Sequence, residues 1–518
     1  MYKMTNRQVK SADFILPAPI GGLNRRDPII SMGLTDAIEM DNYMPSENSV
    51  HLREGYEKYA TVGTFSNTNK IETLVSYQTS DMSKMIAVFG GKAYHLLKNE
   101  VTPYEDVTFS KSRCQTIQYQ GRLFFMNGTD APKVYYVDTS NVEHFETWGF
   151  SGDGLSANQI ISAGLSHEFL WFVEKNSTRA WVADTAGNVS GTLEAFDVGQ
   201  VLKWGGHLVA AFNWTVDGGQ GIDDYTCLMS SEGEVLIYKG YNPNNADNWS
   251  LIGSYKLSKP IGYQCVMAYQ GDVVIISEDG YIPLSSALSI NNSGASKISF
   301  SDKINGLVSE RTGLYKYLEG WHSLIYGKKG YAIFNVPVGN SFEQHVININ
   351  TGAWCRWTNI RAFCWCLHDG ELYFGSDNSV FKFGNTYSDN GMAIEGKVSQ
   401  AYSDLGTHSL KKIPLIKPKI KSSKNFKLKI WTNMDYEDQD IGYYVNIGEG
   451  DEHIVRWNEQ KWNNAYWQSE KTRKMQGQWL LNSATGFKAS VVFKTSTSGN
   501  LIEWYETGMR VQTGTGIL

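Results

Sequence analysis

The sequence has 518 residues, and its 47 basic and 53 acidic side chains give a formal net charge of −6. Hydrophobic residues make up 42%, which excludes a disordered chain, and the acidic balance argues against a strongly basic nucleic-acid-binding protein. The 50 glycines, 16 Trp, 29 Tyr and 22 Phe, with only 19% charged residues, are typical of short strands joined by tight turns. An all-α protein would be richer in good helix formers.

The N-terminal residues 1–19 lack the apolar core of a signal peptide, and no stretch approaches the roughly 18 apolar residues of a membrane span. We therefore expect no membrane span. The six cysteines are scattered along a long chain, unlike a small secreted disulfide framework. We expect reduced, mostly buried thiols in a protein made in a cytoplasm.

Residues 1–55 are predicted to form an extended, turn-rich N-terminal arm. Proline and glycine punctuate this segment, at Pro17, Pro19, Gly21, Gly22, Pro28 and Pro45. An arm of this composition cannot bury itself, so we expect it to pack on another surface of the protein.

A short pattern recurs in the middle of the chain: a turn glycine, a polar residue, then a β-branched or aromatic run. Its starts fall at Gly91, Gly121, Gly206, Gly233, Gly271, Gly330 and Gly370, and Ser166-His-Glu-Phe resembles a copy without the glycine. Glycine tolerates the positive φ of a hairpin turn, and the apolar run after it is typical of a buried strand.

Repeats of about 40 residues that contain four antiparallel strands predict a β-propeller. We expect an all-β protein with about six blades in residues 56–399. A short spacing between Gly206 and Gly233 indicates two hairpins in one blade, and the long spacing between Gly271 and Gly330 indicates an inserted loop. A pair of β-sandwiches or an irregular barrel would use the same hairpins. The best helical segment is Glu310 to Leu318.

Residues 400–518 lack the repeat and are predicted to form a C-terminal, β-sandwich-like platform domain. Eight lysines and no acidic residue lie between Lys411 and Lys429, and seven acidic residues with no Lys or Arg follow between Asp435 and Glu452. Apolar residues alternate with the lysines with a period of two, which predicts two strands and a turn near Ser422-Ser423-Lys424-Asn425.

Three interpretations of the lysine-rich segment stay open at this point: a solvated face, an acidic partner such as residues 435–452 of this or a neighbouring copy, and a nucleic-acid backbone. The subunit-interface candidates are charged residues of the two segments: Lys417, Lys419, Lys421, Lys427, Lys429, Asp435, Asp438 and Asp440.

The sequence contains no complete catalytic or cofactor-binding motif among those we sought. H-E-x-x-H and the G-x-x-x-x-G-K-[ST] phosphate loop do not occur, and the histidines show no metal-ligand spacing. Glu278-Asp279-Gly280 is the most suggestive carboxylate cluster for a glycosidase, but Asp-Gly after a strand is typical of a turn. We therefore expect a protein that is not an enzyme and has no metal or cofactor.

Several segments together resemble one protein family. The N-terminal segments are Pro17-Ala-Pro-Ile-Gly-Gly-Leu-Asn-Arg-Arg-Asp-Pro28, Asp36-Ala, Asp41-Asn-Tyr-Met-Pro45 and Arg53-Glu-Gly-Tyr56. Further along, the likeness continues in Gly271 to Ser285, Ser301-Asp-Lys-Ile304 and Asn350-Thr-Gly-Ala-Trp-Cys-Arg-Trp357. They resemble the tail nozzle, or tail tubular, proteins of short-tailed bacteriophages, also called packaged-DNA stabilisation proteins. The arm residues that carry the motif are Gly21, Gly22, Leu23, Arg25, Asp27, Pro28, Asp41 and Asn42.

The resemblance implies a structural protein of the phage tail, made in the bacterial host cytoplasm. It implies a homohexameric ring below a tail adaptor protein, with fibre, spike or needle proteins as further partners. Double-stranded DNA would pass through the central channel without sequence-specific binding. The arm and the C-terminal domain would build the ring platform together.

Two other functions are compatible with a propeller. One is a glycan-binding or glycan-hydrolysing propeller of a receptor-binding tail part, for which Glu278 and exposed Trp residues are the motivation. The other is a cellular scaffold propeller with no role in a phage.

Overall fold

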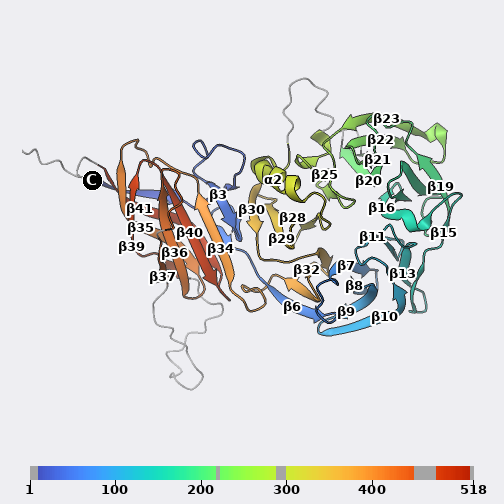
Figure 1. Cartoon of the computed structure of the whole chain (residues 1–518), viewed down its shortest axis with the longest axis horizontal. Coiled ribbons are helices and arrows are strands. Elements are labelled where there is room, and N and C mark those ends of the chain that lie inside the picture. Colours follow the sequence, from blue (N-terminus) through green and yellow to red (C-terminus); the bar gives the residue numbers. More distant parts are fainter. Residues whose placement is uncertain (1–9, 218–221, 287–298, 441, 448–473, 514–518) are drawn as a thin grey trace, which may run out of the picture. The chain divides into compact units, whose positions relative to one another are not determined.

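The computed structural model describes residues 10–217, 222–286, 299–440, 442–447 and 474–513. The chain divides into two compact units and passes between them four times. The propeller unit contains Lys58–His345 and Asn359–Lys382, and the terminal unit contains Met1–Glu57, Val346–Thr358 and Phe383–Leu518. Figure 1 shows the strands of both units.

The propeller unit consists of seven groups of neighbouring strands among its described residues. The first three groups are β7 (Ile71–Gln78), β8 (Ser83–Phe89), β9 (Lys92–Leu97) and β10 (Glu100–Thr108); β11 (Gln115–Tyr119), β12 (Arg122–Met126), β13 (Lys133–Val137) and β14 (Glu143–Thr147); and β15 (Phe150–Ser151), β16 (Ile160–Ser166), β17 (Phe169–Glu174), β18 (Arg179–Ala183) and β19 (Gly191–Asp197).

The other four groups are β20 (Leu208–Asp217), β21 (Ile222–Ser230), β22 (Glu234–Gly240) and β23 (Trp249–Lys256); β24 (Val266–Tyr269), β25 (Asp272–Ser277) and β26 (Gly280–Pro283); β27 (His322–Tyr326), β28 (Tyr331–Val338) and β29 (Ser341–Asn348); and β31 (Cys364–His368), β32 (Glu371–Gly375), β33 (Ser379–Phe383) and β6 (Tyr56–Thr61).

These groups follow one another around a closed ring. The first strands β7, β11, β16 and β20 contact each other in sequence, the fifth group continues from β20, and β24, β27, β31 and β7 complete the circle. The last group borrows its outer strand, β6, from the beginning of the chain. The prediction of an all-β propeller is therefore confirmed, with seven blades in the described residues where the sequence indicated about six.

The repeated turn explains the blade number. Seven of the eight repeat starts lie at a turn inside a blade, one in each, whereas Gly206 precedes the first strand of the fourth blade. In the second blade, Gln120 and Gly121 adopt φ of 46° and 71° between β11 and β12. His167 and Glu168 adopt φ of 50° and 63° at the same place in the third blade, so the copy without glycine makes a similar turn.

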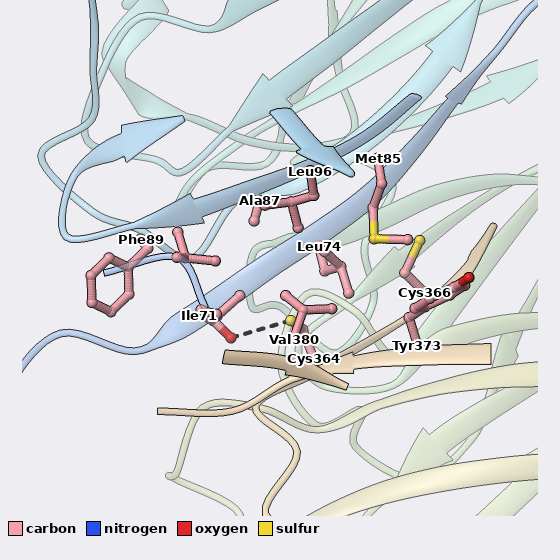
Figure 2. Packing of buried hydrophobic residues seen from close by; sticks show 11 residues of the cluster. Ile71, Leu74, Met85, Ala87, Phe89, Leu96, Cys364, Cys366, Tyr373 and Val380 are labelled. Carbon is pink, nitrogen blue, oxygen red and sulfur yellow. Dashed lines mark hydrogen bonds between the residues drawn. The ribbon is translucent and has the colours of Figure 1, made fainter. Parts of the chain in front are cut away.

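Neighbouring blades are held together by apolar side chains between their sheets. Figure 2 shows the junction of the first and seventh blades, where side chains of β7 and β8 pack against those of β31, β32 and β33. Cys364 and Cys366 belong to this cluster, and the Cys364 thiol lies 3.2 Å from the carbonyl oxygen of Ile71. All six cysteines are buried and free, and burial raises the pKa of the thiols.

The only α-helix of the described residues, α2 (Asn305–Tyr315), lies in the connection between the fifth and sixth blades. It begins five residues earlier and ends three residues earlier than the helical segment predicted from the sequence, and it occupies the long spacing between Gly271 and Gly330. The described residues also contain three short 3₁₀ helices: η1 (Ala157–Gln159), η2 (Ala246–Asn248) and η3 (Asp302–Ile304).

The terminal unit is built from strands of two sheets that pack on each other as a sandwich. The first sheet contains β1 (Lys10–Pro17), β4 (Tyr43–Pro45), β5 (Val50–Leu52), β35 (Lys411–Ser422), β38 (Lys474–Gln476), β39 (Leu480–Gly486) and β41 (Ile502–Thr513). From the second, a ten-stranded sheet, this unit takes β2 (Gly22–Leu23), β3 (Asp36–Asp41), β30 (Ala353–Trp357), β34 (Ile394–Gln400), β36 (Phe426–Met434), β37 (Tyr444–Ile447) and β40 (Ala489–Thr497).

Aromatic stacking marks the interior of the sandwich. The rings of Phe493 on β40 and Trp504 on β41 stack with centroids 4.6 Å apart, and Tyr43 lies edge-on to Phe493. Asn482 on β39 donates hydrogen bonds to Thr432 on β36 and to the carbonyl of Ile413 on β35. The predicted turn after Ser422 separates β35 from β36.

The N-terminal residues are part of this sandwich. All eight residues of β1 pair with β41, and β3 pairs with β34. The unit also takes in 346–358 and 383–399, two segments that lie inside the range expected for the propeller.

Candidate functional site

The segments of the arm and residues 350–357, which carry the family resemblance, meet in the terminal unit, although more than 300 residues separate them. Gly22 has φ of +79°, and a Cβ atom there would lie 2.6 Å from the carbonyl oxygen of Trp354. Only glycine allows the arm to pass this close to β30. Leu23 is buried beside it and pairs with Ala37 on β3.

Asn42 is the centre of a buried polar network. Its backbone has φ of 59°, a conformation that asparagine adopts more readily than most residues. Its side-chain amide donates to Thr358 Oγ1 and to the carbonyl of Glu395, and its carbonyl oxygen accepts from the backbone of Thr358 and from Arg53 Nε at 2.8 Å. One side chain thus fastens together the arm and the segments around residues 358 and 395.

Two arginines extend this network with paired hydrogen bonds to carboxylates. The Arg53 guanidinium donates to both oxygens of Asp389, at 2.8 and 2.7 Å, and both side chains are buried. Arg356 donates to both oxygens of Asp41 at 2.7 Å. Planar, bidentate pairs of this kind fix orientation as well as distance.

A second set of hydrogen bonds surrounds Asn24 of the arm. The Asn24 side chain accepts from the backbone of Arg26 and Asp27 and donates to the carboxylates of Asp27 and Asp36. Arg25 and Pro28, two further motif residues, are exposed. Some motif residues are therefore buried and hold the arm in place, whereas others lie in an exposed turn.

The lysine-rich segment forms β35 and part of β36, as predicted. Lys419 and Lys421 form ion pairs with Glu506 and Glu503 on the neighbouring strand β41. Lys417 lies over the Trp479 ring, at 5.9 Å from its centroid. The acidic partners of β35 thus come from β41, outside the 435–452 segment considered from the sequence.

The other candidate lysines and acids lie around β36 and the residues that follow it. Lys429 pairs with Asp440 at 2.5 Å, so one acidic partner does come from the segment after Asp435. Lys427 pairs in register with Asn446 and Ser496 of the flanking strands. Asp438 accepts from Asn433, and Asp435 accepts from the backbone of Phe487 and Lys488. Glu449, Asp451 and Glu452 lie outside the described residues.

In the propeller unit, charged side chains gather where the first strands of four blades begin. Arg113, just before β11, donates to the carbonyl of Phe363 and to Glu72, and its Nε lies 3.6 Å from Glu319. These partners belong to the seventh, first and sixth blades. We call Lys70, Glu72, Lys111, Arg113, Glu319, Arg361 and Asp377 the axial cluster.

Every cation of the axial cluster has a carboxylate partner. Lys111 pairs with Glu319, and Lys70 and Arg361 share Asp377 at 2.6 and 2.9 Å. Beside the cluster, burial lowers the pKa of His322 to about 4, and its Nε2 accepts from the backbone of Trp365. The cluster holds blades together, and it presents neither a nucleophile nor an unpaired cation for an anionic ligand.

The residues considered for catalysis have structural partners. Glu278 forms an ion pair with Lys316 on the connection after α2, at 3.0 Å, and its carbonyl accepts from Thr312. Glu278 and Asp279 form the turn between β25 and β26, and Gly280 begins β26, so the turn that the sequence indicated is present. Within the described ranges, no group of three or more His, Cys, Asp or Glu residues could hold a metal ion. No helix in those ranges is long and apolar enough to cross a membrane.

No family model matches the sequence, and no curated protein matches it. Among solved structures, the computationally designed Ika8 protein is 10% identical, with a TM-score of 0.33, over 63% of this chain and 99% of that one. The WD40 β-propeller domain of Doa1 is 12% identical, with a TM-score of 0.36, over 64% and 97%. Raptor from Chaetomium thermophilum is 9% identical, with a TM-score of 0.37, over 64% and 29%. These scores carry no functional argument.

Nothing in the sequence around Asp389, Arg113, Glu503 or Glu506 marks these residues as partners. Arg53 and Arg356 stood inside quoted motifs, but nothing in their spacing showed what they bind. Pairing across more than 300 residues leaves no periodic signal in a single sequence, which is why these contacts appear only in the fold.

Proposed function

We propose that this chain is a structural protein of a bacteriophage tail. It forms a ring, and six is the number of copies that we propose. The ring extends the DNA channel below an adaptor protein and helps to retain and later release the packaged genome. The proposal rests on the resemblance of the arm and of residues 350–357 to tail nozzle proteins. The observation that supports it best is that Gly22, Asp41, Asn42, Arg53 and Arg356 meet in one place.

This convergence gives the quoted motifs a common physical role. Residues that only fill loops would have no reason to contact one another, whereas these residues lock the arm to the strands that follow residue 383. A locked platform made from both ends of the chain suits a ring component that has to bear the pressure of packaged DNA.

Charge is consistent with a conduit that lets DNA slide. Six copies would carry a formal charge of −36, six times −6. A basic lining would bind phosphates and release counterions, whereas a net negative or balanced wall keeps DNA mobile. Because the cations of the axial cluster are paired across four blades, we assign the conduit to the space between copies rather than to the propeller of each copy.

The proposed partners are further copies of this chain, the tail adaptor, fibre, spike or needle proteins, and double-stranded DNA in transit. The proposed location is the virion tail. The role is mechanical, with no catalytic residue.

Electron microscopy of the purified protein, alone and mixed with the adaptor encoded beside it, tests this function. We expect rings with a central opening in at least one of the two samples. A protein that stays monomeric in both would overturn the proposal. Terminase, portal and capsid genes as neighbours would argue against a cellular scaffold propeller.

A further inference from the structure

One layer of the terminal unit ends in two strands that each have a single strand neighbour in the described part of the chain. The order across this layer is β39, β35, β41, β1, and each neighbouring pair is antiparallel. No strand of the described residues pairs with the outer edges of β1 and β39, so the backbone N–H and C=O groups there have no strand partner in that part of the chain. Such edges are templates for pairing with another strand.

Natural edge strands are usually protected by charges, proline or bulges. Here β1 has Lys10 and Pro17 at its two ends, and the pairing of β39 with β35 shifts register between Ile413 and Leu415, but the residues between these features are weakly protected. Within β39, from Leu480 to Gly486, there is no charged residue and no proline, and the Leu481 side chain is 71% exposed. On β1 the Ile15 side chain is 62% exposed, and Asp13 is paired with Arg510 of its own sheet. Each edge thus has an exposed apolar side chain, and β39 has no charged residue beside it.

Strand direction makes the two edges complementary to each other. Because the layer has four strands that alternate in direction, β1 and β39 run in opposite directions. A second copy placed beside the first in the same orientation would therefore bring its β39 antiparallel to β1. No inversion of the second copy is needed, so the contact is head-to-tail, and contacts of that type close into rings.

We propose that β1 of one copy adds to the edge of β39 of the next copy, so that one continuous antiparallel sheet runs across the subunit interface. The partner is a second copy of this chain, and the inference rests on the ring-forming function proposed above. Backbone hydrogen bonds provide the affinity in this mode of recognition, and side chains on alternate positions provide the specificity.

The side chains select one register. On β1, Leu16 belongs to the face that packs into the sandwich, since its partner Thr507 is buried, and Leu480 belongs to the same face of β39. Matching of the faces allows only registers that differ by two residues. The register with the longest overlap pairs Leu16 with Leu480 and Ile15 with Leu481, so apolar residues meet at these two positions. The same register places Ser11 opposite Thr485.

Two charge substitutions at exposed positions test the contact. We expect the wild-type chain to form a ring, and Ile15→Lys and Leu481→Lys each to be monomeric by mass photometry and analytical ultracentrifugation. Tyr317→Lys, at an 84% exposed position of the propeller unit, is the matched control and should keep the wild-type mass. A lysine variant that retains the wild-type mass, or a wild-type chain that is monomeric alone, would overturn the edge contact.

Mixing the two variants tests the head-to-tail geometry. The Ile15→Lys chain keeps an intact β39 and the Leu481→Lys chain an intact β1, so an equimolar mixture should yield heterodimers and nothing larger. Homodimers of Leu481→Lys alone would mean that β1 pairs with β1, and they would refute the geometry. Because the side chains of Ile15 and Leu481 are both largely exposed, neither substitution buries a charge, and circular dichroism should show unchanged folding.

A disulfide cross-link tests the register. Ser11→Cys combined with Thr485→Cys should give intermolecular cross-links, because directly paired residues have Cα atoms about 4.5–5.5 Å apart. Ser11→Cys with Leu481→Cys is the control, since four residues along a strand displace the partner by about 13 Å. Equal cross-linking of both pairs would refute the register. Rings that persist with both edges blocked would refute this inference alone and leave the proposed function intact.

Discussion

Arg53 and Asp389 form a buried, bidentate ion pair, with the two guanidinium nitrogens 2.8 and 2.7 Å from the two carboxylate oxygens. The pair joins the end of the N-terminal arm to a segment that follows the last strand of the propeller. Because neither group is accessible to water, each depends on the other for compensation of its charge.

Removal of one member of this pair should be strongly destabilising. We expect Asp389→Asn or Arg53→Met to lower the free energy of unfolding by about 3–5 kcal/mol, because the remaining charge stays buried without its counterion. Arg26→Ala is the control: Arg26 is paired with Asp27 at an exposed site, where the loss should be within about 1 kcal/mol. Denaturant titration followed by Trp fluorescence measures both. Similar losses for Arg53 and Arg26 variants would contradict a special role for the buried pair.

Replacement by alanine should destabilise the fold more at Gly22 than at Gly352, another glycine with positive φ. Both Gly22 and Gly352 have positive φ, +79° and +68°, but a Cβ at Gly352 would meet no atom within 4 Å. We expect Gly352→Ala to show only the left-handed backbone cost of about 1–2 kcal/mol. The clash with Trp354 should add about 1–3 kcal/mol in Gly22→Ala. Thermal unfolding of the two variants provides the comparison. Equal midpoints would show that the backbone of the arm shifts to accommodate the added Cβ.

His322 should make the propeller unit sensitive to acid. Its pKa in the fold is about 4, below the usual 6.5, so the unfolded chain binds the proton first as the pH falls. The stabilisation is complete above pH 6.5 and is lost as the pH falls from 6.5 toward 4, by roughly 3 kcal/mol. His322→Gln should flatten this part of the stability profile. His408→Gln, at a 91% exposed side chain, should leave it unchanged. An unaltered profile for His322→Gln would mean that other groups carry the acid dependence.

Charge reversal of Lys417, Lys419 and Lys421 to Glu should weaken ring assembly. Within one chain it also places like charges beside Glu503 and Glu506, which should cost about 0.2–1 kcal/mol for each exposed pair. Adding Glu503→Lys and Glu506→Lys should restore the stability of the single chain. Sedimentation of the triple variant measures assembly. An unchanged oligomer mass would refute an inter-subunit role for these lysines. It would favour a solvated face whose lysines contact only residues of their own chain.

The sequence was most informative where structure depends on neighbours in the chain. Turn glycines such as Gly121 and Gly271 indicated the blades, because the positive φ of a turn is a local requirement. The sequence nevertheless indicated about six blades instead of seven, and nothing local showed that β6 completes the last blade from far away in the chain. The partner of Arg53 could not be found locally, because Asp389 is 336 residues distant and no pattern in one sequence encodes such a pair.

The borrowed strand β6 has a consequence for synthesis of the protein. Thr61 on β6 and Ser379 on β33 lie in hydrogen-bonding contact across 318 residues. During translation, β6 leaves the ribosome early and has to wait for β33, so the last blade stays incomplete while the other six are made. Contacts of such long separation form slowly, and exposed strand edges invite wrong pairing in the meantime. Nascent chains are therefore prone to associate with one another until the seventh blade closes.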